Sequence, residues 1–300
     1  MQILRGQHIH VHQLAISPDS RYVVAAGHWG LNVWDLHHPN AKPALHAGTM
    51  TAVQFVSDGR LFSVTRTGWL LLDPADGRSI SWQGPTNYRA AASVSPCGQF
   101  VIECEYASTS VVHRWRLRED GLGLHRELVW SRPQEPLEMM HSGPLIASDA
   151  ERFAVGVYVL NQEDRPWTIH RTADGEALAK LEGELFYHHY WTQFTPDGGK
   201  FLAGAKSDIY EWDARAGGAG RLAVRHPNGR WFRGVAVHPD GTTLAGVTSD
   251  GVSLFELASG GLLRTYDWKF GNLRRVAFTP DGTRCAIAES NSRVLLFDVE

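Results

Sequence analysis

A short pattern recurs along this chain: an apolar run, a tight turn built on Asp, Gly or Pro, and a second apolar run. It is clearest in LAISPDSRYVVAAG from Leu14, GVAVHPDGTTLAG from Gly234 and VAFTPDGTRCAIA from Val276. Taking one turn position as the marker gives Asp19, Asp58, Cys97, Asp149, Asp197, Asp240 and Asp281. The markers are about 40 to 50 residues apart, which is the length of a four-stranded repeat unit. The chain therefore contains seven copies of one structural unit.

The turns have the composition of tight hairpins. Pro presets the backbone at the second turn position, whereas Asp and Gly tolerate the conformations that follow. A third apolar run comes after most hairpins and ends in a pair such as Trp34-Asp35, Trp212-Asp213 or Phe297-Asp298. A fourth run leads to the next copy, and no segment keeps a helical periodicity over a useful length. We expect an all-β protein made of four-stranded antiparallel units.

These residues resemble the WD-repeat β-propeller family, whose repeat combines a Gly-His, a Ser-Pro-Asp-Gly turn and a Trp-Asp. The segment from Leu4 to Asp35 carries the pattern most fully. The resemblance implies a single domain over residues 1–300, folded as a seven-bladed propeller. It also implies that residues 1–5 supply the outer strand that the last blade lacks, which closes the ring and removes an open sheet edge.

Composition excludes several classes of protein. The 300 residues carry a formal net charge of −3, so there is no basic excess of the kind that nucleic-acid binding needs. Three cysteines without a CxxC pair give neither a disulfide framework nor a zinc ribbon. No signal peptide and no apolar run long enough to span a membrane are seen, so we expect a cytoplasmic protein. We also expect a monomer.

Sequence motifs for catalysis are missing as well. The sequence has no nucleophile elbow, HExxH, P-loop, dinucleotide fingerprint or EF-hand loop. We therefore expect no enzyme activity and no cofactor. His8, His10 and His12 alternate along one strand, as adjacent metal ligands would. However, same-side neighbours on a strand are well apart and no Cys or carboxylate lies at a ligand-like spacing, so no metal site is predicted.

The loops can be assigned to two faces, because a propeller places the connections between second and third strands, and those between blades, at one end. Large aromatic residues collect in the segments of this top face, among them Trp29, Trp231, Phe232 and Trp268. The hairpin turns of the opposite face contain none. Because exposed aromatic residues dominate interface energetics, the top face is the predicted binding surface.

Aligning the starts of the first strands gives pairs of residues that should face the channel mouth. The pairs include His10/His12, His188/Tyr190, Trp231/Arg233 and Asn272/Arg274, from blades one, five, six and seven. Arg233 and Arg274 are permanently charged planar donors suited to carboxylate or phosphate groups. We expect a protein or peptide partner, acidic where it meets this sector. The predicted partner-binding residues are His10, His12, Trp29, His188, Tyr190, Trp231, Arg233, Trp268 and Arg274.

Two alternatives remain open from the sequence. A small-molecule-binding or hydrolytic propeller would have its ligand in the channel mouth, near His10, His12, His188 and Tyr190. A purely structural module would show an unremarkable top face and an apolar patch elsewhere. The long connection from Arg118 to Met140 leaves open whether blade four carries an insertion that reaches over a face.

Overall fold

The computed structural model describes residues 1–7, 9–48, 50–65, 68–83, 91–105, 111–120, 123–133, 144–156, 167–183, 189–249, 251–267 and 270–299. Within these ranges the chain forms strands and turns and no helix, so no helix long and apolar enough to cross a membrane is found there. The all-β expectation is confirmed.

The strands group into seven four-stranded units, which we number as blades in chain order. Blade 1 contains β2 (Val11–Ile16), β3 (Tyr22–Gly27), β4 (Gly30–Asp35) and β5 (Ala44–Ala47). Blade 2 contains β6 (Met50–Phe55), β7 (Leu61–Thr65), β8 (Gly68–Leu72) and β9 (Ser79–Gln83). Blade 3 contains β10 (Ala91–Val94), β11 (Phe100–Glu105), β12 (Val111–Asp120) and β13 (Gly123–Pro133). Blade 4 contains β14 (Leu145–Ile146), β15 (Arg152–Gly156), β16 (Trp167–Arg171) and β17 (Ala177–Glu182).

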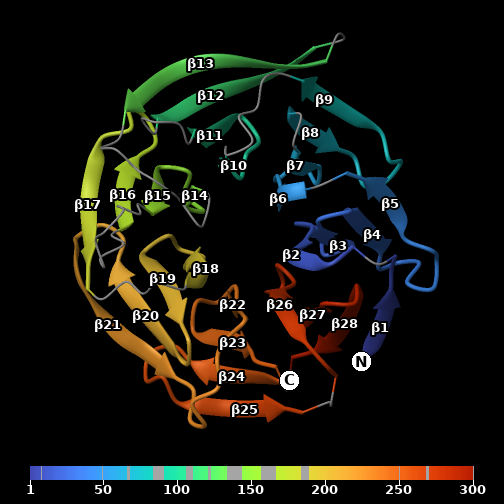
Figure 1. Cartoon of the computed structure of the whole chain (residues 1–300), viewed down its shortest axis with the longest axis vertical. Coiled ribbons are helices and arrows are strands. Elements are labelled where there is room, and N and C mark those ends of the chain that lie inside the picture. Colours follow the sequence, from blue (N-terminus) through green and yellow to red (C-terminus); the bar gives the residue numbers. More distant parts are fainter. Residues whose placement is uncertain are drawn as a thin grey trace.

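The remaining blades follow the same plan. Blade 5 contains β18 (His189–Phe194), β19 (Lys200–Ala205), β20 (Asp208–Asp213) and β21 (Gly217–Arg225). Blade 6 contains β22 (Gly234–Val237), β23 (Thr243–Val247), β24 (Val252–Glu256) and β25 (Leu262–Tyr266). Blade 7 contains β26 (Leu273–Phe278), β27 (Arg284–Glu289), β28 (Arg293–Asp298) and the N-terminal strand β1 (Gln2–Arg5). Figure 1 shows the seven units arranged around a central opening, with β1 beside β28.

The first hairpin of each blade is the turn that the sequence marked. In blade 7 the Asp281 carboxylate accepts a hydrogen bond from the Thr283 backbone N–H at 3.0 Å, and the Gly282 N–H donates to the Thr279 carbonyl. Gly282 has a φ of +73°, in the region that glycine adopts without strain. Local turn chemistry therefore fixes where each pair of strands reverses.

The hydrophobic core consists of clusters of buried side chains between neighbouring blades. One cluster lies between blades 7 and 1 and contains Leu4, Ile9 and Trp34, each at most 2% exposed. In the same region β1 pairs antiparallel with β28, with Leu4 opposite Val294. The indole Nε1 of Trp34 donates to the Arg5 carbonyl at 3.3 Å. The two ends of the described chain are thus held in one sheet and one apolar cluster.

Blades 4 and 5 are linked at their outer edges. Their fourth strands, β17 and β21, pair in parallel, with Leu181 opposite Gly218.

The long connection that follows Arg118 belongs mostly to blade 3. Strands β12 and β13 extend as one hairpin of blade 3, not of blade 4, and residues 134–143 lie outside the described ranges. Cys97 is exposed, and Cys104 and Cys285 are buried.

Candidate functional site

The top face carries two strongly exposed tryptophans. Trp29 lies in the turn between β3 and β4 and is 61% exposed, and Trp231 lies just before β22 and is 51% exposed. Phe232, the next residue, is 1% exposed and packs edge-on against Phe255 with ring centroids 5.8 Å apart. Of this aromatic pair, one ring is presented to solvent and the other belongs to the core.

The first strands begin in the same irregular way in several blades. The register slips by one residue at His12, Tyr190 and Arg274, so each of these is a bulge residue. Two residues before the bulge, His10 has a φ of +54° and Asn272 a φ of +53°. A bulge re-aims side chains at a strand end. His12, Tyr190 and Arg274, which the sequence aligned, therefore occupy equivalent places in blades 1, 5 and 7.

Arg275 holds together the strand starts that carry Arg233 and Arg274. Its Nε donates to the His12 carbonyl at 2.8 Å, and its Nη1 donates to the carbonyls of Arg233 and Arg274 at 2.8 and 2.9 Å. Burial, and then the nearby charge of Arg274, lower the pKa of Arg275. One guanidinium thus ties the first strands of blades 6, 7 and 1 together at the channel mouth.

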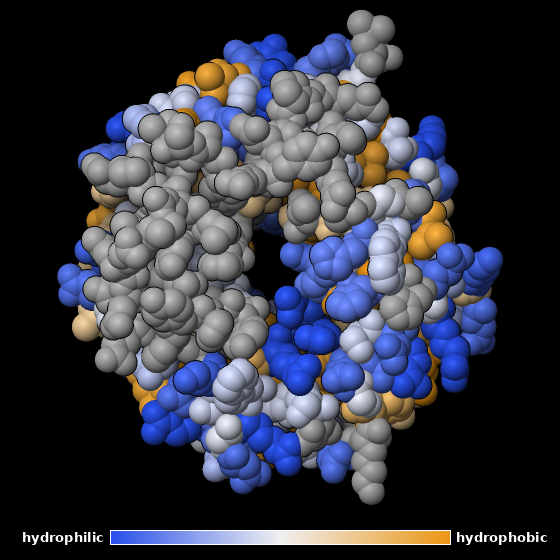
Figure 2. Space-filling model, viewed as in Figure 1, coloured by the Kyte–Doolittle hydropathy of each residue, from blue (hydrophilic) through white to orange (hydrophobic). Residues whose placement is uncertain are grey.

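Sequence reasoning selected Arg274 and missed Arg275. The only signal available was that two arginines occur in succession at a strand start, where neighbouring side chains point to different sides. The bulge at Arg274 decides which one turns inward, and a bulge is not visible in the sequence. Figure 2 shows hydrophilic side chains gathered beside the central opening, over β22, β26 and β2.

A further histidine, His28, lies beside the predicted residues His10 and His12, although the sequence analysis did not include it in the site. His28, in the β3–β4 turn, lies against His12 with ring centroids 4.3 Å apart and against His10 at 5.8 Å. His10 also makes an edge contact with Trp29, with centroids 6.3 Å apart. Blade 1 therefore presents three imidazoles and an indole in one group.

The other predicted site residues are only partly described. His188 and Trp268 lie outside the described residues, and the backbone of Tyr190 is placed but its side chain is not. Arg233 and Arg274 are half-buried. The described part of the predicted surface is therefore the sector of blades 6, 7 and 1, and the contribution of blade 5 stays a prediction.

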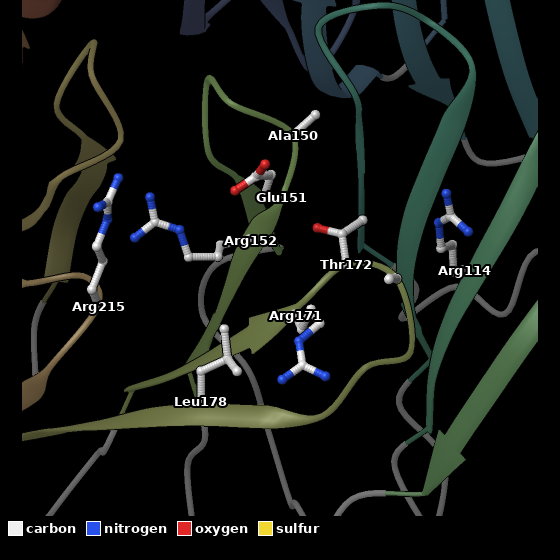
Figure 3. Close-up of a pocket in the computed structure, with 9 residues that line it drawn as sticks. Arg114, Ala150, Glu151, Arg152, Arg171, Thr172, Leu178 and Arg215 are labelled. Carbon is white, nitrogen blue, oxygen red and sulfur yellow. The ribbon is translucent and has the colours of Figure 1, made fainter.

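A separate cavity of about 550 Å³ lies at the opposite end of the blades (Figure 3). It is lined by residues of blades 3, 4 and 5, including Arg114, Glu151, Arg152, Arg171, Thr172 and Arg215. Arg152 is buried and pairs with Asp149, and Arg171 pairs with Asp174 and Glu176. Much of the positive charge in this cavity is therefore neutralised by neighbouring carboxylates.

The fold and the repeated units define a β-propeller. A family model described as "WD domain, G-beta repeat" matches residues 1–35, which cover β1 and the first three strands of blade 1. No curated protein gave a significant match. The match covers one repeat at the start of the chain, and together with the repeated four-stranded sheets it supports a likeness to the WD-repeat β-propellers. WD-repeat propellers generally serve as protein-interaction scaffolds and are typically not enzymes.

Proposed function

We propose that this protein is a non-enzymatic scaffold whose top face, over blades 6, 7 and 1, binds an acidic segment of a protein partner. The observation that carries the proposal is the combination of two exposed tryptophans with two arginines at the first strands of neighbouring blades. Trp29 and Trp231 offer large apolar surface on one rim. Arg233 and Arg274 supply planar cationic donors between them along the ring.

The backbone of this sector is held in place before any partner arrives. Arg275 is half-buried and donates hydrogen bonds to three carbonyl groups, so the strand starts that carry Arg233 and Arg274 have little freedom. A preorganised surface loses less conformational entropy on binding. This supports recognition by the rigid strand starts together with the exposed indoles.

A peptide-binding assay tests the proposal directly. A library of acidic peptides is compared with a matched library in which Asp and Glu are replaced by Asn and Gln. The protein should select acidic peptides, and Arg233→Glu/Arg274→Glu should weaken the selected ones by about 10-fold or more, since each close charge pair contributes on the order of 1 kcal/mol or above. Trp29→Ala should weaken them by a similar factor.

The control variant is Arg78→Glu/Arg215→Glu, which makes the same change of charge at two exposed arginines on the opposite face. The control should leave affinity within about 2-fold, because charges beyond a Debye length of roughly 8 Å are screened. Equal loss in both double variants, or equal binding of the acidic and amide libraries, would contradict the proposal.

A further inference from the structure

The three histidines of blade 1 form a group with the geometry of a metal site. One ring nitrogen from each of His10, His12 and His28 lies within 4.8 Å of the other two. A tetrahedral zinc site with bond lengths near 2.0–2.1 Å places its ligand atoms about 3.3 Å apart. The group therefore has to contract by about 1.5 Å at most. His10 is exposed and stands at the start of the strand, so its side chain has room to make that movement.

The fold brings these three residues together through one glycine. Gly27 ends β3 directly before His28, and a Cβ at this position would lie 1.9 Å from the Ile9 carbonyl oxygen and 2.6 Å from that of His10. Only glycine permits the backbone carrying His10 to lie so close to the end of β3. The bulge at His12 then turns that ring toward His28. The cluster is thus built by backbone features of blade 1 and does not depend on long, freely rotating side chains.

The backbone holds one nitrogen of His12. The His12 ring donates a hydrogen bond to the Met50 backbone. A histidine that donates through one nitrogen keeps the lone pair of the other, as ligating histidines do.

The chemistry of the donors selects the kind of ion. Three imidazoles suit zinc, nickel and copper, whereas magnesium and calcium prefer oxygen ligands. Among the described residues the group contains no carboxylate. The charge of Arg275 works against any cation, so the affinity should be lower than that of a structural zinc site. Three protein ligands also leave a fourth position open, as in catalytic zinc sites.

The geometry points to a binding site for a divalent late transition-metal ion, with zinc as the representative, formed by His10, His12 and His28. This site is separate from the proposed partner surface in its chemistry, because it needs no acidic segment and involves neither Arg233 nor Arg274 as a ligand. Its test accordingly uses the metal alone.

Titration calorimetry of untagged full-length protein with Zn²⁺ measures the affinity and the stoichiometry. We expect one site in the wild type. Loss of an outer-shell partner of a metal ligand lowers metal affinity roughly 10- to 100-fold. His12→Ala and His28→Ala each remove a ligand, so each should lower the Zn²⁺ affinity by at least that factor. The matched control is His37→Ala/His38→Ala, which removes two exposed histidines at the other end of blade 1 and should change nothing. Co²⁺ gives a second readout, since a tetrahedral nitrogen site produces an intense visible absorption.

Three outcomes overturn the inference. The first is an unchanged Zn²⁺ affinity in His12→Ala and His28→Ala. The second is an equal loss of affinity in the control variant, and the third is a Co²⁺ spectrum as weak as that of a hexahydrate-like site. Should either cluster variant fail to fold, His10→Gln replaces it, because His10 is exposed. The same loss of affinity and of the Co²⁺ spectrum is then expected.

Discussion

Replacing Arg126 by methionine should reveal how blades 2 and 3 are held together. The guanidinium of Arg126, on β13, lies between the rings of Trp82 on β9 and Trp115 on β12, at 3.6 and 3.9 Å from their centroids. Its Nη1 donates to the Glu103 carboxylate at 3.1 Å, and the Trp115 indole donates to the same oxygen at 2.8 Å. Glu103 is 6% exposed. The Arg126 guanidinium thus contacts two aromatic rings and pairs with a buried carboxylate.

The magnitude follows from what the substitution leaves behind. Burial raises the pKa of Glu103 even with Arg126 beside it, so desolvation already outweighs the attraction. Without Arg126, an uncompensated buried charge costs about 3–5 kcal/mol, and lost cation–π contacts add to this. We expect unfolding free energy to fall by about 4 kcal/mol at pH 7. Adding Glu103→Gln to Arg126→Met should recover about half, because the buried charge is then gone.

The pH dependence gives an independent check. In Arg126→Met the folded-state pKa of Glu103 stands above its unfolded value near 4.5. Such a group contributes stability below the unfolded pKa and loses it as pH rises through the folded pKa. The deficit relative to wild type should therefore be smaller at pH 5 than at pH 8.

The assay is urea unfolding followed by tryptophan fluorescence, with Arg116→Met as the matched control. Arg116 is on the neighbouring strand and pairs with Glu127, but both side chains are about half exposed, so the control should cost less than about 1 kcal/mol. The reasoning fails if Arg126→Met is no more costly than Arg116→Met, or if Glu103→Gln gives no recovery.

Three further outcomes are expected. Leu4→Ala should lower the unfolding free energy of the whole protein by about 2–5 kcal/mol. Ile3 is partly exposed, so Ile3→Ala should lower it by less than about 1 kcal/mol. Separate melting of blade 7 alone would speak against ring closure by β1. Burial lowers the pKa of His170, so wild-type stability should fall as pH drops below 6.5, and His170→Phe should show a shallower fall in urea midpoints between pH 7.5 and 5.5. Gly27→Ala should cost about 1–3 kcal/mol in calorimetry because its Cβ meets backbone oxygens, whereas Gly271→Ala, with open space around it, should be within about 0.5.

The candidate site was only partly visible in the sequence. Trp29 and Trp231 were assigned to the top face, and the structure places both as exposed. The alignment of strand starts selected Trp231 and not Phe232, and in the structure Trp231 is exposed whereas Phe232 is buried against Phe255 of the same blade. His28 was missed as a companion of His12, since the two belong to different strands and meet only after the sheet has formed.

The sequence by itself determined the repeat. Asp, Gly or Pro in each turn acts through hydrogen bonds and backbone torsions a few residues apart, so the sequence alone predicts where seven pairs of strands reverse. Tertiary structure decided which side chains face the channel mouth. A bulge displaces the alternation by one residue, and so Arg275 turns inward to bind three carbonyls where Arg274 does not. Contacts between blades have no local signature, because each blade buries its faces against a neighbour far away in the chain.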